Sequence, residues 1–279
     1  MEEPFIGSEA VAVGAASHSQ LRRRYRRLFP DVYVGKVPDA TPEDLAKAAW
    51  LWSRRRGIVA GFSACALLGS KWVDSTQPVE LLYGNRNHPA GLHVHGDRLE
   101  DDEVQIIAGI LVTTPARTAL DLACWYPTLT AVPAIDAVAG ACEVKMHEVE
   151  TLAQRCRGRR GIRRARTSLD LVDPGAQSPK ESWLRVILVR AGFPRPQTQI
   201  PVCDEFGEVF AYLDMGWDDV KLAVEYDGEQ HRTDRRQYRW DVRRKEMVER
   251  QGWVLVRVVA GDEPAEIVRR VRSAWSRRT

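Results

Sequence analysis

Residues 211–231 read AYLDMGWDDVKLAVEYDGEQH, and this stretch decides how the last part of the chain is expected to fold. Residues 209–214 and 222–227 show the two-residue alternation of β-strands. The residues between them, Gly216, Trp217, Asp218 and Asp219, are expected to form a polar turn. The stretch therefore predicts two short strands joined at residues 216–219.

Three carboxylates in this stretch are expected to share a small space. Glu225 and Asp227 are two positions apart on one strand, so they project from the same face, and Asp214 is expected to end the neighbouring strand. Carboxylates this close raise each other's pKa unless a cation binds them. Mg²⁺ is commonly held by one or two carboxylates. The reaction class this pattern suggests is metal-assisted hydrolysis of a phosphodiester.

Simpler explanations exist for some of these acids. Asp218 and Asp219 are common turn formers. Glu225 is different, because it follows the apolar run 222–224, where an unpaired carboxylate would be costly. We therefore expect a metal ion, an arginine or an open cleft beside Glu225.

A helix is predicted to begin at Ser178. Ser178 fits the N-cap, Pro179 the first helical position and Glu181 the third position of a capping box, and Gly192 fits the end of the helix. Glu181 is explained equally well by capping or by support of the acidic site.

Several spaced motifs connect this part of the chain to a known family. They are Ser-Pro-Lys-Glu at 178–181, Leu-Asp at 213–214, Val-Glu-Tyr-Asp-Gly at 224–228, His231, Asp241 with Arg244, and Gly-Trp-Val-Leu-Val-Arg at 252–257. With these motifs, the segment from about Ser178 to Val259 resembles the very-short-patch-repair-endonuclease-like (Vsr-like) domain of unknown function, within the PD-(D/E)xK nuclease superfamily. The resemblance implies a restriction-endonuclease-like α/β/α fold for residues 173–279.

The resemblance also implies roles for individual residues. Asp214 and Glu225 would bind Mg²⁺ or Mn²⁺, and His231 would act as an acid or base. The residues that would support them are Asp227, Glu181 and Asp241. The superfamily usually has a lysine where this chain has Asp227. Either another cation takes its role, for which the candidates are Lys221, Lys245 and His231, or the nuclease has lost its activity.

A second helix is expected from about Thr233 to Gln251, followed by a buried strand at 253–259 and a closing helix at 263–279. On the second helix, spacings of three and four place several residues on one side, which is expected to line the cleft: Asp241, Arg244, Lys245 and Val248. Arg244 and Lys245 are therefore candidate nucleic-acid contacts.

Near the N-terminus, residues 20–28 read QLRRRYRRL. As a helix, this segment places Leu21, Tyr25 and Leu28 on one face and its arginines outward, and the strand 32–34 follows. A helix, a turn, a basic helix and a wing are expected. The candidate DNA contacts are Arg22, Arg23, Arg24, Arg26 and Arg27, although a basic helix is also compatible with a solvated surface.

The first part of the chain carries a second set of motifs. They are Gln-Leu-Arg-Arg-Arg at 20–24, Asp-Val-Tyr-Val at 31–34, Gly-Phe-Ser-Ala-Cys-Ala-Leu-Leu-Gly at 61–69, Leu-His-Val-His at 92–95, and the segment 109–122 beginning Gly-Ile-Leu-Val-Thr-Thr-Pro. Residues 1 to about 170 thereby resemble AbiEi-like antitoxins and transcriptional regulators of type IV toxin–antitoxin systems. The resemblance implies a winged helix-turn-helix, truncated at its start, over 1–37, a compact domain over 38–172, DNA as a partner and a cognate toxin.

In this middle region, helices are predicted from Thr41-Pro42 to Gly57 and from Thr114-Pro115 through Ala123. His93 and His95 share a strand face, but no third metal ligand is evident, so ordinary histidines are favoured.

Residues 155–166 contain seven arginines in twelve positions. Such a run is usually solvated, yet before a nuclease-like domain it is also suited to following a phosphate backbone. The candidate contacts are Arg159, Arg160, Arg163 and Arg164. A domain boundary is expected at 173–177.

Composition limits the class of protein. With 279 residues, 44% hydrophobic and 28% charged, the chain is long enough for two globular domains. The net charge of +3 is a mild basic bias. The five cysteines are widely spaced, with no Cys-x-x-Cys, so a disulfide framework and a cysteine zinc site are not expected. No stretch has transmembrane length, so we expect a cytoplasmic protein with no membrane partner.

Together these patterns predict an α+β protein that is a divalent-metal-dependent DNA endonuclease with a DNA-binding N-terminal half. The alternative is a non-catalytic DNA-binding antitoxin or autoregulatory repressor with a degenerate nuclease fold. RNA is a further alternative substrate.

Overall fold

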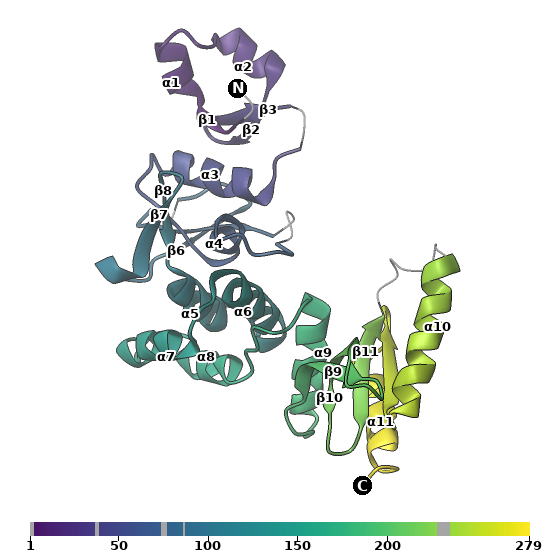
Figure 1. Cartoon of the computed structure of the whole chain (residues 1–279). Helices are drawn as coiled ribbons and strands as arrows, with labels where there is room; N and C mark the ends of the chain where they lie inside the picture. Colours follow the sequence, from purple (N-terminus) through teal and green to yellow (C-terminus); the bar gives the residue numbers. More distant parts are fainter. Residues whose placement is uncertain (1–2, 37–38, 74–76, 86, 228–234) are drawn as a thin grey trace. The chain divides into compact units, whose positions relative to one another are not determined.

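The structure is a computed structural model that describes residues 3–36, 39–73, 77–85, 87–227 and 235–279, with the side chains of 235–242 outside this description. The fold class is α+β, as expected, and the chain divides into two compact units, Met1–Pro174 and Gly175–Thr279 (Figure 1). The division falls inside the linker expected at 173–177. Among the described helices, none combines the length and apolar character needed to span a membrane.

The first unit begins with a small antiparallel sheet in the order β1-β3-β2, formed by β1 (Phe5–Ile6), β2 (Tyr25–Phe29) and β3 (Val32–Gly35). Helices α1 (Gly7–Ala12) and α2 (His18–Arg24) lie between β1 and β2 in the chain. Ser17 caps α2: its Oγ accepts a hydrogen bond from the Gln20 amide at 3.2 Å, and the Gln20 side chain accepts one from the Ser17 amide at 2.7 Å.

The prediction of a helix over residues 20–28 is wrong for the second half of this segment, because α2 ends at Arg24 and β2 begins at Tyr25. Tyr25 already has an extended backbone, with φ −119° and ψ 153°, and Tyr25 pairs with Gly35 on β3. Pairing with a strand that lies later in the chain outcompetes the local helical spacing, because aromatic residues pack well on a sheet. Arg26 and Arg27 therefore lie on β2 and not on a helix.

Helix α3 (Pro42–Trp52) joins this sheet to a second one. Its small residues Ala46, Ala48 and Ala49 share a core with Phe29 and Val32 of the first sheet and with strands of the second. Thr41 and Asp44 form a capping box at the predicted start of this helix. The helix ends at Trp52 and not at Gly57, because Arg54 and Arg55 adopt left-handed conformations with φ 57° and 63°.

The second sheet has the order β6-β5-β4-β8-β7. Its strands are β4 (Ile58–Val59), β5 (Val79–Leu82), β6 (Leu92–His95), β7 (Val104–Ile107) and β8 (Ile110–Thr113). Helix α4 (Gly61–Leu67) follows β4, and the short 3₁₀ helix η1 (Asp101–Glu103) precedes β7.

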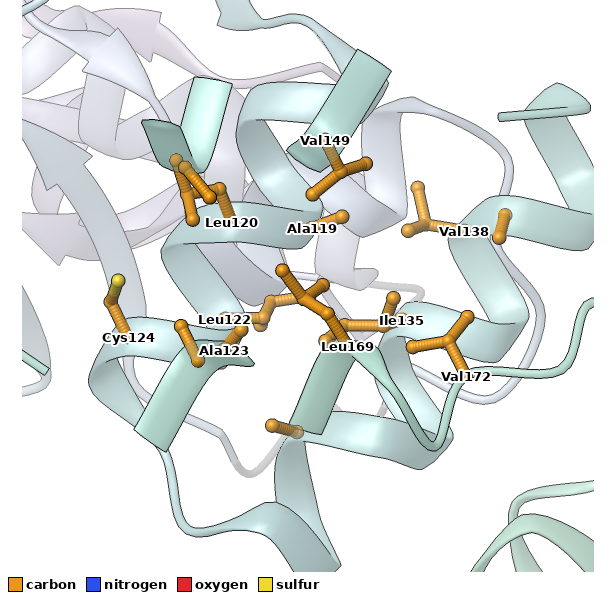
Figure 2. Packing of buried hydrophobic residues seen from close by; sticks show 14 of the residues in the cluster. Ala119, Leu120, Leu122, Ala123, Cys124, Ile135, Val138, Val149, Leu169 and Val172 are labelled. Atoms are coloured by element: carbon orange, nitrogen blue, oxygen red, sulfur yellow. The ribbon is translucent and has the colours of Figure 1, made fainter. Parts of the chain in front are cut away.

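Four helices complete the first unit: α5 (Pro115–Trp125), α6 (Thr128–Cys142), α7 (Met146–Arg155) and α8 (Ile162–Leu169). Leu122 and Ile135 from the first pair meet Val149 and Leu169 from the second pair in one apolar core (Figure 2). Thr114 caps α5 with Pro115 at its first turn, as expected.

The second unit is a four-stranded sheet between helices. Its elements are, in chain order, α9 (Pro179–Arg190), β9 (Gln197–Cys203), β10 (Val209–Trp217), β11 (Leu222–Asp227), α10 (Arg235–Arg250), β12 (Val254–Val259) and α11 (Pro264–Trp275). The sheet order is β12-β11-β10-β9; β10 is antiparallel to both neighbours, and β11 is parallel to β12.

Separate apolar clusters cover the two faces of this sheet. Leu184 of α9 and Ile267 of α11 pack with Val224 of β11, whereas Val248 of α10 packs with Leu213 of β10. The unit therefore has three layers, helix, sheet and helix. The hairpin turn expected at 216–219 lies instead at 218–221, because β10 continues through Trp217, which pairs with Leu222.

Candidate functional site

Strands β10 and β11 stop pairing where the predicted acidic residues lie. Their last paired residues at this end are Met215 and Val224. Beyond them, the Tyr226 amide donates a hydrogen bond to Oδ2 of Asp214 at 2.9 Å. A carboxylate thus takes the place of a strand carbonyl as the acceptor for β11. Asp214 lies within β10 and does not end it, which corrects the expectation from the alternation.

Asp214 is partly buried in an acidic environment. The pKa of Asp214 is raised to about 7, mainly by burial and also by the nearby charges of Glu181 and Glu225, against the lowering effects of the Tyr226 amide and of Arg244. The carboxyl group therefore holds its proton to a higher pH than an ordinary aspartic acid does. A bound cation would favour the ionised form.

Glu225 is paired with an arginine. Its side chain is 10% exposed, and Nη2 of Arg244 donates to its Oε1 at 2.9 Å. The same nitrogen donates to the Tyr212 carbonyl at 2.6 Å. A metal ion, an arginine or an open cleft was expected beside Glu225, and the structure places an arginine there, Arg244 of α10.

Glu181 is the capping residue that the sequence predicts. Its amide donates to Ser178 Oγ at 3.2 Å, and its carboxylate accepts from the Gln177 amide at 3.1 Å and from Ser178 Oγ at 2.9 Å. Glu181 is also close enough to raise the pKa of Asp214. Capping and proximity to the acidic site therefore coincide in this residue.

Gln199 was not predicted from the sequence. It faces Asp214 across the β9–β10 pairing, between the pairs Leu213–Ile200 and Met215–Thr198. Its side chain donates to Oε2 of Glu181 at 3.3 Å, and its φ of 50° is unusual for a residue within a strand. Nothing in the local sequence identifies this glutamine, because only the sheet pairing brings it to the site.

Other candidates lie elsewhere. Lys221 donates to Asp218 at 2.7 Å in the hairpin turn, at the opposite end of β11 from Glu225, so its expected role at the site is wrong. Lys245 is exposed and lies 3.7 Å from Glu249. Asp227 is half-buried at the end of β11. Two further candidates, His231 and the side chain of Asp241, lie outside the described residues.

The donor set partly fits a hard cation. The described residues contain no group of three or more His, Cys, Asp or Glu side chains arranged to hold a metal. Mg²⁺, however, keeps several waters and needs only one or two carboxylates. Among the described residues, the second oxygens, Oδ1 of Asp214 and Oε2 of Glu225, accept no hydrogen bond from the protein. These two oxygens are the available hard ligands.

The middle region of the first unit contains a buried ionic network. Arg117, 1% exposed, donates from Nε to Asp121 at 2.7 Å and also pairs with Glu103. Arg159, 8% exposed, pairs with Asp121 at 2.7 Å and with Asp97 at 3.0 Å. The expected phosphate-contacting role of Arg159 is wrong, because its guanidinium is already neutralised by these carboxylates.

The other arginines of this run differ from Arg159. Arg160, Arg163 and Arg164 are exposed, and Arg164 also donates to the Cys124 carbonyl. These three residues remain candidate phosphate contacts.

His95 is a hydrogen-bonded histidine and not half of a metal pair. Its Nε2 lies 3.1 Å from the fully buried Glu80, which also accepts from the Tyr126 hydroxyl at 2.9 Å. The imidazole stacks on Trp125 with ring centroids 3.5 Å apart. His93, in contrast, is exposed.

The basic residues near the N-terminus face solvent in part. Arg22, Arg23 and Arg24 are exposed on α2, and Arg27 is exposed on β2. Arg26 pairs with Asp39 at 3.0 Å. Of the five arginines predicted to contact DNA, Arg22, Arg23 and Arg24 are therefore the ones that lie exposed on a single helix.

Known proteins match this chain in two ways. Residues 78–171 match the family model of the AbiEi antitoxin C-terminal domain. Two proteins of Mycobacterium tuberculosis, the uncharacterized protein Rv2248 of strain ATCC 25618 / H37Rv and the uncharacterized protein MT2308 of strain CDC 1551 / Oshkosh, are each 30% identical over 253 residues, covering 88% of this chain and 90% of the relative. The chain belongs to their family. No solved structure matches it.

In this member of the family, the AbiEi-like region includes the buried network of Arg117, Glu103, Asp121, Arg159 and Asp97. The AbiEi match ends at residue 171, before the second unit begins at Gly175. The Vsr-like character of the second unit therefore stays a prediction from its motifs.

Proposed function

We propose that this protein binds DNA through its first unit and hydrolyses phosphodiester bonds with a divalent cation in its second unit. The observation that carries the proposal is the convergence of polar side chains from five elements where β10 and β11 separate. They are Glu181, Gln199, Asp214, Glu225 and Arg244. Several acidic side chains gathered beside one arginine, at partly buried positions, are more typical of a functional site than of a stabilising core.

In this proposal, Asp214 and Glu225 hold Mg²⁺ or Mn²⁺ with one oxygen each. The cation, when bound, supplies an activated water and offsets charge on the phosphate. Asp214 must lose its proton to take part, which its pKa of about 7 permits at mildly alkaline pH. Glu181, held by Ser178, lies beside Asp214, and Arg244 supplies a positive group suited to a phosphate.

The first unit supports the DNA-binding half of the proposal. Its AbiEi-like region and the exposed arginines 22–24 of α2 suit a protein that contacts DNA as part of a toxin–antitoxin system. A cognate toxin is the partner proposed on the same ground.

A second function is favoured by one observation. Arg244 already neutralises Glu225, so the acids need no metal to be accommodated. In that case the second unit is a scaffold, and the protein is a DNA-binding antitoxin or autoregulatory repressor that does not cleave.

A nicking assay separates the two functions. The full chain is incubated with supercoiled plasmid in Mg²⁺, Mn²⁺ or EDTA at pH 8, with Asp214→Asn and the turn variant Asp218→Asn as a matched pair. The nuclease proposal expects metal-dependent nicking by the wild type and by Asp218→Asn, and none by Asp214→Asn. Absence of nicking together with retained promoter binding supports the repressor and refutes the nuclease.

A further inference from the structure

The Arg244 side chain makes two contacts with a single nitrogen. Nη2 donates both to Glu225 Oε1 at 2.9 Å and to the Tyr212 carbonyl at 2.6 Å. Among the described residues, Nη1 and Nε of this guanidinium have no acceptor in the protein. Nε and Nη1 therefore remain available as single donors, whereas either two-nitrogen fork for a phosphate includes Nη2 and requires Arg244 to release one of its present acceptors.

The position of the pair favours exchange of partners. The Arg244 side chain is 23% exposed, whereas that of Glu225 is 10% exposed. The arginine thus forms the solvent-facing side of an otherwise covered carboxylate. A ligand arriving from solvent meets the guanidinium before it meets Glu225.

Electrostatics oppose a cation while Arg244 remains on Glu225. A guanidinium and a divalent cation that share one carboxylate repel each other, and at a partly buried site this repulsion is screened less than in bulk water. A cation on Glu225 therefore displaces the guanidinium or binds weakly. A phosphate that accepts the guanidinium removes this competition.

We propose that Arg244 is an exchangeable counter-ion, which pairs with Glu225 in the free protein and moves to a nucleic-acid phosphate when a divalent cation binds the carboxylates. This inference rests on the proposed function, because it uses the same acids as cation ligands. Reciprocity of binding free energies then requires that cation and phosphodiester each raise the affinity for the other. The site would bind metal firmly only when a nucleic acid is present.

The test is Mn²⁺ binding to the full chain, measured from the loss of the electron paramagnetic resonance signal of free Mn²⁺. The variants are Arg244→Gln, the charge-retaining Arg244→Lys, and Arg243→Gln, which removes the same charge from the exposed neighbouring position. Each is measured alone, with an oligothymidylate, and with its uncharged methylphosphonate analogue. Hydrogen exchange of the β10 and β11 amides establishes that each variant is folded.

We expect Arg244→Gln to bind Mn²⁺ about fivefold or more tightly than the wild type without oligonucleotide. The charged oligonucleotide is expected to raise Mn²⁺ affinity for the wild type and Arg244→Lys, and not for Arg244→Gln. Arg243→Gln is expected to follow the wild type. Adding Glu225→Gln to Arg244→Gln is expected to remove the gain.

The proposal is overturned if Arg244→Gln binds Mn²⁺ no more tightly than the wild type, or if both oligonucleotides act equally. These outcomes are distinct from those of the nicking assay. If the wild type nicks DNA but Arg244→Gln binds Mn²⁺ no more tightly, the proposed nuclease function stands and the counter-ion exchange of Arg244 is refuted. A protein that does not nick but shows the gain keeps the exchangeable cation site and loses the catalytic function.

Discussion

Asp214→Asn is expected to stabilise the second unit at pH 8, although it removes a proposed ligand. The pKa of Asp214 is raised from an ordinary 3.8 to about 7, mainly by burial. Between these values the folded protein retains a proton that the unfolded chain has released, so stability falls as the pH rises through this window. Asparagine has a similar shape, retains an acceptor for the Tyr226 amide and carries no charge.

The magnitude follows from the pKa. At about 1.4 kcal/mol for each pH unit, the difference between 3.8 and about 7 corresponds to about 4 kcal/mol of destabilisation when Asp214 is fully ionised. We expect Asp214→Asn to recover on the order of 1–4 kcal/mol at pH 8 and close to nothing at pH 4. The wild type is expected to lose stability between pH 4 and pH 8 relative to the variant.

The measurement is urea unfolding of the full chain in EDTA at pH 4, 6 and 8. Hydrogen exchange of β10 and β11 peptides at each urea concentration assigns the transition to the second unit. Asp218→Asn is the control, because Asp218 is exposed in the hairpin turn and pairs with Lys221. If the free energy of unfolding changes with pH in the same way for the wild type and Asp214→Asn, or if the variant is less stable at pH 8, burial of the ionised Asp214 does not destabilise the fold.

Three further changes test the rest of the fold. Arg117→Met should destabilise the first unit by about 3–5 kcal/mol in urea unfolding, because buried carboxylates lose their partner, and a cost below about 1 kcal/mol contradicts the network. Gly61→Ala should lower the melting temperature more than Gly69→Ala does: both glycines have positive φ, but a Cβ at Gly61 would overlap the Glu80 carboxylate, whereas one at Gly69 meets nothing within 4 Å. Equal decreases in melting temperature would mean that the positive φ alone, and not the overlap with Glu80, sets the cost of the substitution. Ser178→Ala should cost about 1 kcal/mol and increase hydrogen exchange in the first turn of α9, and unchanged exchange there would argue against the cap.

Helix starts were predictable because capping is local. Thr41, Thr114 and Ser178 each accept a hydrogen bond from an amide three residues later, and each is followed by proline. The information needed lies within one turn of helix. Helix ends and the first strand pairing were less predictable, because partners distant in the sequence decide them.

The seven arginines of residues 155–166 show the limit of composition. Arg159 and Arg160 are neighbours of the same type, yet one is buried between Asp97 and Asp121 and the other faces solvent. Their difference arises from where the loop between α7 and α8 meets the rest of the unit. No local pattern carries that information.

For the candidate site, the sequence by itself determined that Asp214 and Glu225 lie on adjacent strands, because a two-residue alternation and a short hairpin are properties of neighbouring residues. Only the tertiary structure decided that Gln199 joins them and that Arg244, which the sequence placed on the side of a helix expected to line the cleft, pairs with Glu225. The first arrives through pairing of β9 with β10 and the second through packing of α10 on the sheet. The charge balance of the site therefore depends on contacts between elements distant in the chain, which is why the residue types alone left open whether Glu225 faces a metal, an arginine or water.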